Sequence, residues 1–300
     1  NRWDFDDGSS EWMDRFRISA NAVYPFLHSG EVAFLRFAPA DEKAPDAVKG
    51  ELNWLLWLRE RGFPANRPLR AKGGQLVAEA DTPWGRYVAA AFAGVPGRPL
   101  DDTGLTPDIA AAWGASLGRL HQLSAQCPAM ARPDHDAALV WSGREMAALG
   151  DREAVDEAHR LRDRLSALPR EHYGLVHYDF ETDNVFYDPA TGIHAIDFDD
   201  CMYHWYALDV EQALYSLPPG AGDAIERAFL TGYRAQYPLP DDALALRPLM
   251  RRFADLYGYA RARRAAVEAW DCEPEWMAGL RGYFDTLLKQ RASAFGAPLP

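Results

Sequence analysis

Three polar residues near the middle of the chain have the types and the order that phosphoryl transfer requires. Asp179 follows a short apolar run and stands five residues before Asn184, and Asp197 ends a second apolar run 13 residues beyond Asn184. One Asp can accept the proton of a substrate hydroxyl, while an Asn and a second Asp hold a divalent cation against phosphate oxygens. This set predicts metal-assisted transfer of a phosphoryl group to a hydroxyl.

A simpler interpretation treats the same residues as parts of turns. Asp and Asn are common in turns, so the stretches ETDN and YDPATG would then only connect strands. Asp197 and Asp199 would be charges on edge strands. That interpretation explains each residue singly, but it does not explain their ordered combination.

The segments HYDFETDN and IDFDD resemble the aminoglycoside phosphotransferase family, part of the protein-kinase-like superfamily that includes choline and homoserine kinases. The resemblance implies that Asp179 is the catalytic base and that Asn184 and Asp197 bind Mg²⁺, with ATP or GTP as co-substrate. It gives His177 a structural place beside the catalytic loop. It also places Asp209 at the start of a helix beneath that loop, although a local helix cap is an alternative for Asp209.

The resemblance also locates the nucleotide side of the site, since neither a P-loop nor a Rossmann glycine motif is present. It implies that Ser19 and Asn21 lie in a turn that covers the phosphates, although a plain hairpin turn would use the same residues. The usual phosphate-binding Lys of the third strand is replaced by Arg36, with Glu51 as its predicted partner on a helix. An edge-strand Arg and a Glu near a helix N-terminus are the alternative. Phe92 is expected to flank the nucleotide base.

The elements that must position these residues fall into two parts. Strands are predicted over 16–37, around 75–80 and over 87–92, with one main helix over 44–61 that ends at a glycine. Glycines and prolines from 94 to 99 mark a boundary. Helices then dominate, and they are predicted over 107–123, 153–168, 207–217, 224–237, 244–266 and 275–295.

This layout favours an α+β, bilobal protein-kinase-like fold, as the resemblance also implies. Residues 1–93 are expected to form a nucleotide-binding lobe with a small antiparallel sheet and one main helix. Residues 94–300 are expected to form a larger, mainly helical lobe for catalysis and substrate binding.

Composition excludes several classes of protein. The 300 residues carry a net charge of −12, with a pI near 5.1, which disfavours binding to nucleic acid. The spacing of the three cysteines matches neither a metal site nor a disulfide framework. No apolar run approaches the roughly 18 residues of a membrane span. A cytoplasmic protein without a membrane partner is expected.

The acceptor is the least constrained part of the prediction. Asp199, Tyr203, Trp205 and Glu273 are candidate substrate contacts, because acidic and aromatic groups suit an amine-bearing alcohol such as an aminoglycoside. Tryptophans in a helical lobe are more often core residues, and Asp200 is expected to be an exposed turn charge. Two other functions stay open: a nucleotide-binding pseudokinase that regulates a partner, and a kinase-fold nucleotidyl transferase that modifies a protein.

Overall fold

The computed structural model describes residues 2–18, 21–217, 220, 222–267 and 276–300, and the chain divides into two compact units. Unit 1 contains Asn1–Arg132, His177–Cys201 and Ser216–Pro238, and unit 2 contains Pro133–Val176, Met202–Tyr215 and Leu239–Pro300. The expected lobe boundary between residues 93 and 94 stays a prediction.

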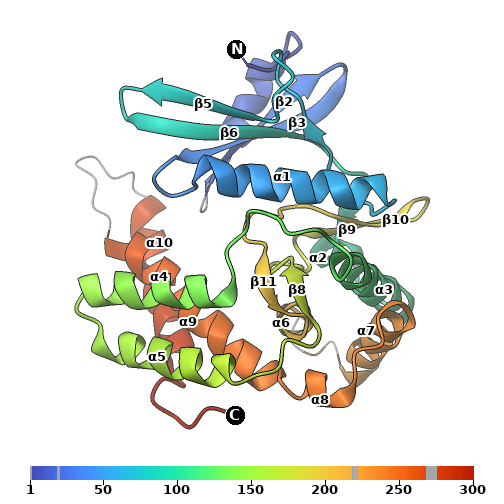
Figure 1. Cartoon of the computed structure of the whole chain (residues 1–300). Coiled ribbons are helices and arrows are strands. Elements are labelled where there is room, and N and C mark those ends of the chain that lie inside the picture. Colours follow the sequence, from blue (N-terminus) through green and yellow to red (C-terminus); the bar gives the residue numbers. More distant parts are fainter. Residues whose placement is uncertain (1, 19–20, 218–219, 221, 268–275) are drawn as a thin grey trace. The chain divides into compact units, whose positions relative to one another are not determined.

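Unit 1 combines an antiparallel sheet with helices (Figure 1). Its six-stranded sheet has the order β1-β2-β3-β6-β4, with β5 also paired to β6, and β10-β9-β7 form a second sheet. The elements are η1 (Ser9–Arg15), β1 (Arg17–Ile18), β2 (Ala22–His28), β3 (Glu31–Pro39), α1 (Pro45–Glu60), β4 (Pro68–Leu69), β5 (Val77–Thr82), β6 (Gly85–Ala93), β7 (Arg98–Pro99), α2 (Leu100–Thr103), α3 (Pro107–Ser124), β9 (Val185–Asp188), β10 (Gly192–Ala195) and α7 (Asp223–Gln236).

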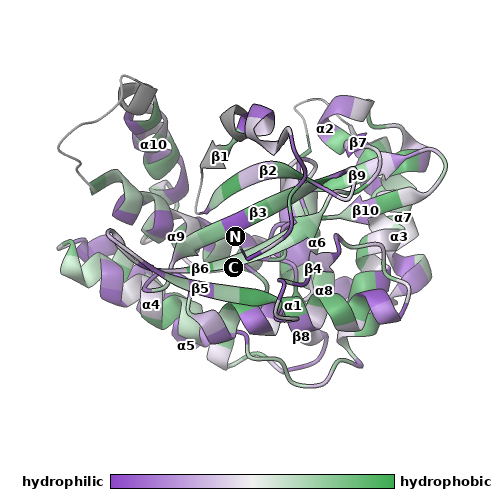
Figure 2. Ribbon diagram, turned by 90° about the horizontal axis from the view of Figure 1, so that it is seen from above, coloured by the Kyte–Doolittle hydropathy of each residue, from purple (hydrophilic) through white to green (hydrophobic). Residues whose placement is uncertain are grey.

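The large sheet has two faces with different tasks, because successive side chains of a strand alternate between them. One face packs a core that includes Trp3, Leu69 and Ala91, and Leu35 of β3 packs against this core. Hydrophobic residues run along β6 in Figure 2. The neighbour of Leu35, Arg36, pairs with Ala90 of β6 and points to the opposite face, where it reaches helix α1.

Helix α1 confirms the helix predicted over 44–61. It begins at Pro45, whose missing N–H costs nothing at a helix start, and the chain leaves the helix at Gly62 with a φ of +77°. Its buried side chains include Leu52, Trp54 and Leu58. These apolar contacts fix the helix in unit 1, and the buried Glu51 lies on the same helix.

Helices α3 and α7 pack unusually closely, because each presents glycine to the other. A Cβ built on Gly114 of α3 would lie 1.9 Å from the Phe229 carbonyl oxygen, and one on Gly232 of α7 would lie 1.9 Å from the Ala111 carbonyl oxygen. Beside this contact, Trp113 and Phe229 form an edge-to-face pair with centroids 4.7 Å apart. Any larger residue at either glycine must push the two helix backbones apart.

Replacement of Gly232 with Ala is therefore expected to lower the free energy of unfolding by about 1–3 kcal/mol, the usual cost of overpacking. Chemical denaturation measures this change. Gly282→Ala is the matched control, since a Cβ on Gly282 of helix α10 meets nothing within 4 Å. Ala should favour that helix by about 0.5–1 kcal/mol. Equal stabilities of the two variants would contradict the close helix contact.

Unit 2 is mainly helical and carries one two-stranded sheet, β8-β11. Its elements are α4 (His135–Ala148), α5 (Arg152–Ser166), β8 (Tyr173–Val176), β11 (Met202–Trp205), α6 (Ala207–Tyr215), α8 (Asp241–Leu244), α9 (Arg247–Val267) and α10 (Trp276–Ala292). Polar and apolar residues alternate along α5 in Figure 2, as expected for a helix with one solvent face. Helix α4 and strand β11 were not predicted. No helix among the described residues is long and apolar enough to cross a membrane.

A histidine is buried without a full set of hydrogen bonds in unit 2. His204 of β11 is fully buried, and its Nδ1 accepts the Trp205 N–H at 2.9 Å. Its Nε2 has no hydrogen-bond partner in the described part of the chain, and the ring of His135 lies with its centroid 5.6 Å away. Burial, followed by the charge of His135, lowers the pKa of His204 well below 6.5.

This depressed pKa predicts a loss of stability in acid. The unfolded state binds a proton on His204 more readily than the folded state, so the free energy of unfolding should fall as the pH drops below about 6.5. The His204→Gln variant should show a shallower fall between pH 6.5 and 5 in denaturant titrations. His159→Gln, at an exposed position of α5, is the control and should keep the wild-type slope. An unchanged slope in His204→Gln would refute this explanation.

Candidate active site

The loop before β9 brings the predicted base and one predicted metal ligand into direct contact. Asn184 donates a hydrogen bond from its amide nitrogen to Asp179 Oδ2 at 2.8 Å. The same nitrogen lies 3.3 Å from the Asp179 carbonyl oxygen. Because Asp179 takes up the nitrogen, Oδ1 is the Asn184 atom with which this side chain would bind a cation. Both side chains are half-buried.

His177 connects this loop to the segment that carries Asp197. Its Nδ1 accepts the Asp179 N–H at 3.2 Å, so Nε2 carries the proton that is donated to the Ile196 carbonyl oxygen at 3.0 Å. The ring packs against Phe198, with centroids 4.3 Å apart, and Phe198 in turn meets Trp54 of α1. These contacts support the predicted structural role of His177.

The apolar neighbours of Asp197 suggested that it lies on a strand, but the structure places it outside the strands. Strand β10 ends at Ala195, and Asp197 has a φ of +61°, in the left-handed region. Tyr178, directly before Asp179, has a φ of +75°. Non-glycine residues rarely adopt this conformation, and such residues cluster at functional sites. Here the conformation occurs directly before the predicted base, Asp179, and at the predicted metal ligand, Asp197.

The predicted ion pair between Arg36 and Glu51 is present. Arg36 Nη2 lies 2.5 Å from Glu51 Oε2, and both side chains are buried, with exposed fractions of 9% and 1%. Arg36 Nη1 lies 3.7 Å from Asp197 Oδ1. The guanidinium also covers the ring of Phe92, 5.0 Å from its centroid. Removing one partner of such a buried pair typically costs about 3–5 kcal/mol, so the pair fixes β3 against α1.

Asp199 is occupied by other protein groups. Its carboxylate accepts a hydrogen bond from Asn21 at 2.8 Å and lies 2.5 Å from Lys43 Nζ and 3.6 Å from Arg36 Nη1. Lys43 also lies 3.2 Å from Asp200, so Asp200 is a paired, half-buried residue and not the exposed turn charge that the sequence suggested. Sequence reasoning missed Lys43, because a single Lys between β3 and α1 forms no motif.

A second missed residue is Arg132, which clamps the backbone around Asp199. Its guanidinium donates to the carbonyl oxygens of Asp199 at 2.5 Å, Cys201 at 2.8 Å and Ala47 at 2.9 Å. Ala47 belongs to the first turn of α1, so the clamp ties the Asp199 loop to that helix. Ala131, directly before Arg132, packs closely against Gly50 of α1, since a Cβ built on Gly50 would lie 2.3 Å from the Ala131 carbonyl oxygen.

The pKa values of the carboxylates of the site are shifted in opposite directions. Burial, and then the charges of neighbouring acidic groups, raises the pKa of Asp179 well above its usual value. Burial also raises the pKa of Asp197 to about 6 against the opposing effect of Arg36. Asp199 is the exception. Although burial opposes its ionisation, Arg36 and Lys43 hold its pKa far below the usual range.

A divalent cation would stabilise the ionised form of Asp197, whose pKa burial raises. The Asp197 side chain is crowded by protein atoms yet 47% exposed, so a ligand can reach it. No group of three or more His, Cys, Asp or Glu side chains that could hold a metal occurs among the described residues. A site with one carboxylate and one amide suits Mg²⁺, which keeps waters and binds phosphate oxygens for its remaining positions.

Other predicted residues lie outside this cluster or outside the described residues. Tyr203 and Trp205 lie on β11 in unit 2, where Trp205 is buried and donates its indole N–H to the Pro169 carbonyl oxygen at 2.8 Å. Asp209 is buried in the first turn of α6. Ser19 and Glu273 lie outside the described residues. The roles predicted for these residues stay predictions.

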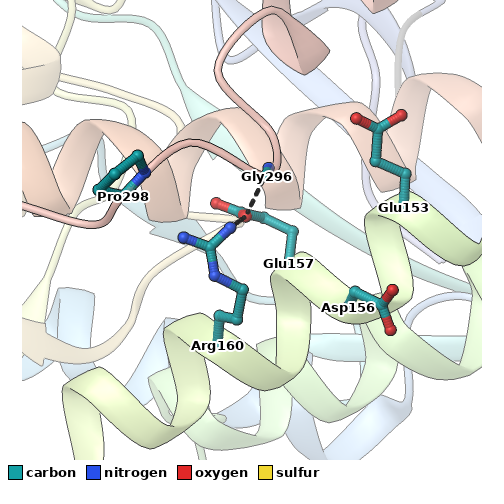
Figure 3. A pocket seen from close by; sticks show the side chains of 6 residues that line it. All are labelled: Glu153, Asp156, Glu157, Arg160, Gly296 and Pro298. Atoms are coloured by element: carbon teal, nitrogen blue, oxygen red, sulfur yellow. Dashed lines mark hydrogen bonds and ion pairs between the residues drawn. The ribbon is translucent and has the colours of Figure 1, made fainter.

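A separate cavity of about 500 Å³ occurs in unit 2 (Figure 3). Its lining residues are Glu153, Asp156, Glu157, Arg160, Gly296 and Pro298. The buried Glu157 accepts hydrogen bonds from Arg252 at 3.0 Å, Arg160 at 3.1 Å and the Gly296 N–H at 3.4 Å. These bonds attach the C-terminal segment to α5, so Glu157 stabilises the structure of unit 2.

Comparison with known proteins gives consistent results. The family model described as "Phosphotransferase enzyme family" matches residues 18–249. The amicoumacin kinase of Bacillus subtilis (strain 168) is 26% identical over 294 residues, which cover 91% of this chain and 87% of that protein.

Solved structures show the same fold. A structure of amicoumacin kinase hAmiN, in complex with AMP-PNP, Ca²⁺ and Ami, has a TM-score of 0.76 at 22% identity, covering 99% of this chain and 92% of that one. A microcompartment-associated aminopropanol kinase has a TM-score of 0.68 at 22% identity, covering 100% and 97% of the two chains. The predicted α+β, protein-kinase-like fold is confirmed by these likenesses.

Proposed function

We propose, from the premise that this chain belongs to the phosphotransferase enzyme family, that it transfers the γ-phosphoryl group of ATP or GTP to a hydroxyl of an amine-bearing small molecule. The chain is a small-molecule kinase, as its family and its similarity to amicoumacin kinase indicate. The observation that carries the mechanism is the contact of Asn184 with Asp179, joined through His177 to the segment of Asp197.

Each residue of this set has a separate task in the proposal. Asp179 accepts the proton of the acceptor hydroxyl, and Asn184 holds its carboxylate in place. Asn184 Oδ1 and Asp197 hold a divalent cation, with Mg²⁺ as the expected ion. When bound, the cation offsets charge on the phosphate oxygens. Arg36, fixed by Glu51, adds a permanent positive charge beside Asp197.

The acceptor class follows from charge and from the relatives. The chain has a net charge of −12, and Asp179 lies near the acidic residues Glu181, Asp200 and Asp197. An ammonium group on the acceptor would be attracted to this region. The similarity to enzymes named amicoumacin kinase and aminopropanol kinase supports an amine-bearing alcohol, and aminoglycosides belong to this class.

A panel of hydroxyl compounds tests this function. ADP and GDP release is measured with ATP and GTP for amino alcohols, amino sugars and aminoglycosides, alongside neutral and anionic alcohols of similar size. At least one amine-bearing alcohol should stimulate release in the wild type and not in Asp179→Asn. Stimulation confined to neutral or anionic acceptors would refute the amine proposal while leaving the phosphotransferase assignment in place.

A further inference from the structure

Two cations face the same small pocket of unit 1, and their surroundings differ. The pocket is lined by Asn21, Arg36, Phe37, Ala38, Lys43, Val48, Val88, Ala89, Ala90 and Asp199. It thus has a polar side, with two cations, an amide and the carboxylate of Asp199, and an apolar side on β3, β6 and α1. Its volume is only about 10 Å³, which is at most room for one water molecule. A phosphate group can therefore enter only when a lining side chain moves.

Arg36 is poorly suited to move. Its guanidinium is buried, bonded to the buried Glu51 at 2.5 Å and placed against the Phe92 ring. It also lies within 4 Å of both Asp197 and Asp199. Its Nη2 is held by Glu51 and its Nη1 faces Asp197 and Asp199, so a shift of the guanidinium would disturb three carboxylates, one of them the buried Glu51.

Lys43 is more exposed than Arg36 and can move more easily. Its side chain is 21% exposed, and it carries a compact charge on a flexible stem. It lies 2.5 Å from Asp199 but 3.2 Å from Asp200, whose side chain is more exposed than that of Asp199, at 15% against 6%. A phosphate oxygen can thus replace the weaker Asp200 contact while Lys43 keeps its contact with Asp199.

We propose that Lys43 binds the phosphates of the nucleotide and that Arg36 serves as the fixed cation that positions β3, α1 and the Asp197 loop. This division of tasks rests on the proposed function, because it assumes that the chain binds a nucleotide. It assigns to a residue outside β3 the phosphate contact that the sequence placed on Arg36. Asn21, directly before β2, is hydrogen-bonded to Asp199 at 2.8 Å and so lies beside the partner of Lys43.

Binding of ADP and adenosine, measured by isothermal titration calorimetry in the presence of Mg²⁺, tests the proposal. In Lys43→Met, the Kd for ADP should rise about 10- to 100-fold, the loss expected for one charge-assisted contact. The Kd for adenosine should stay unchanged, because the nucleoside has no phosphate. Lys49→Met is the matched control, since Lys49 is exposed on α1 and pairs with the exposed Asp46, and it should match the wild type.

A combined variant separates direct binding from simple charge neutralisation. If Lys43 only masks the charges of Asp199 and Asp200, then Asp199→Asn and Asp200→Asn added to Lys43→Met should restore the wild-type Kd for ADP. If Lys43 contacts phosphate, this combined variant should remain weak. Full restoration, or equal losses for ADP and adenosine, would overturn the proposal. A wild type that binds no ADP would instead refute the proposed function.

Discussion

Asp179→Asn is expected to lower kcat by about 10²- to 10⁴-fold, the usual contribution of a general base, and to leave the Kd for nucleotide nearly unchanged. Asn keeps the shape of Asp and can still accept the hydrogen bond that Asn184 donates at 2.8 Å. The loss would therefore report the missing basic oxygen and not a displaced loop. Steady-state product formation and nucleotide titration measure the two quantities.

Asp183→Asn is the matched control for this variant, since Asp183 is exposed four residues further along the same loop. Its kcat should lie close to that of the wild type. Equal losses of turnover and nucleotide affinity in Asp179→Asn would contradict the assignment of Asp179 as the base.

Asp197→Asn should lower activity to a similar extent, but through weaker binding of the divalent cation and not through loss of the base. The amide lacks the negative charge that would hold a divalent cation, so we expect kcat/KM at fixed Mg²⁺ to fall by at least about 10²-fold, equivalent to several kcal/mol of lost charge stabilisation. The Mg²⁺ concentration for half-maximal activity should rise. Arg36, whose main partner is Glu51, should stay in place.

Nucleotide titrations with and without Mg²⁺ identify the cause of this loss. If Asp197 binds the cation, the variant should lose the Mg²⁺-dependent part of ADP affinity and keep the affinity measured in EDTA. An unchanged Mg²⁺ dependence would show that Asp197 is not a cation ligand.

Much of the fold could be predicted because its signals are local. The helix predicted over 44–61 occupies Pro45–Glu60, and the one predicted over 107–123 occupies Pro107–Ser124, with Thr106 accepting the Ile109 N–H as a cap. Helix α4 was missed because the apolar residues of HDAALVWSGREMAA do not gather on one face. Its Asp134 cap, which accepts the Ala137 N–H at 2.9 Å, was the available signal. Strand β11 is four residues long and pairs with the distant β8.

The site shows the same division between local and distant information. Asp179 and Asn184 belong to one short segment, so their spacing was readable. Lys43 and Arg132 meet Asp199 from positions 156 and 67 residues away, and neither has a neighbour in sequence that marks it. Such contacts are set by how α1 and the Asp199 loop pack, which residue spacing does not contain.

The fate of the nucleotide phosphates tests the central claim most directly. ATP labelled at the γ-phosphate, and separately at the α-phosphate, is incubated with the chain, Mg²⁺ and the best acceptor from the panel, and the small-molecule and protein fractions are counted. The γ label should appear on the small molecule in the wild type and be absent with Asp179→Asn. The α label on protein would instead indicate nucleotidyl transfer, and nucleotide binding without transfer of either label would indicate a regulator. Either result would contradict the proposed phosphotransferase.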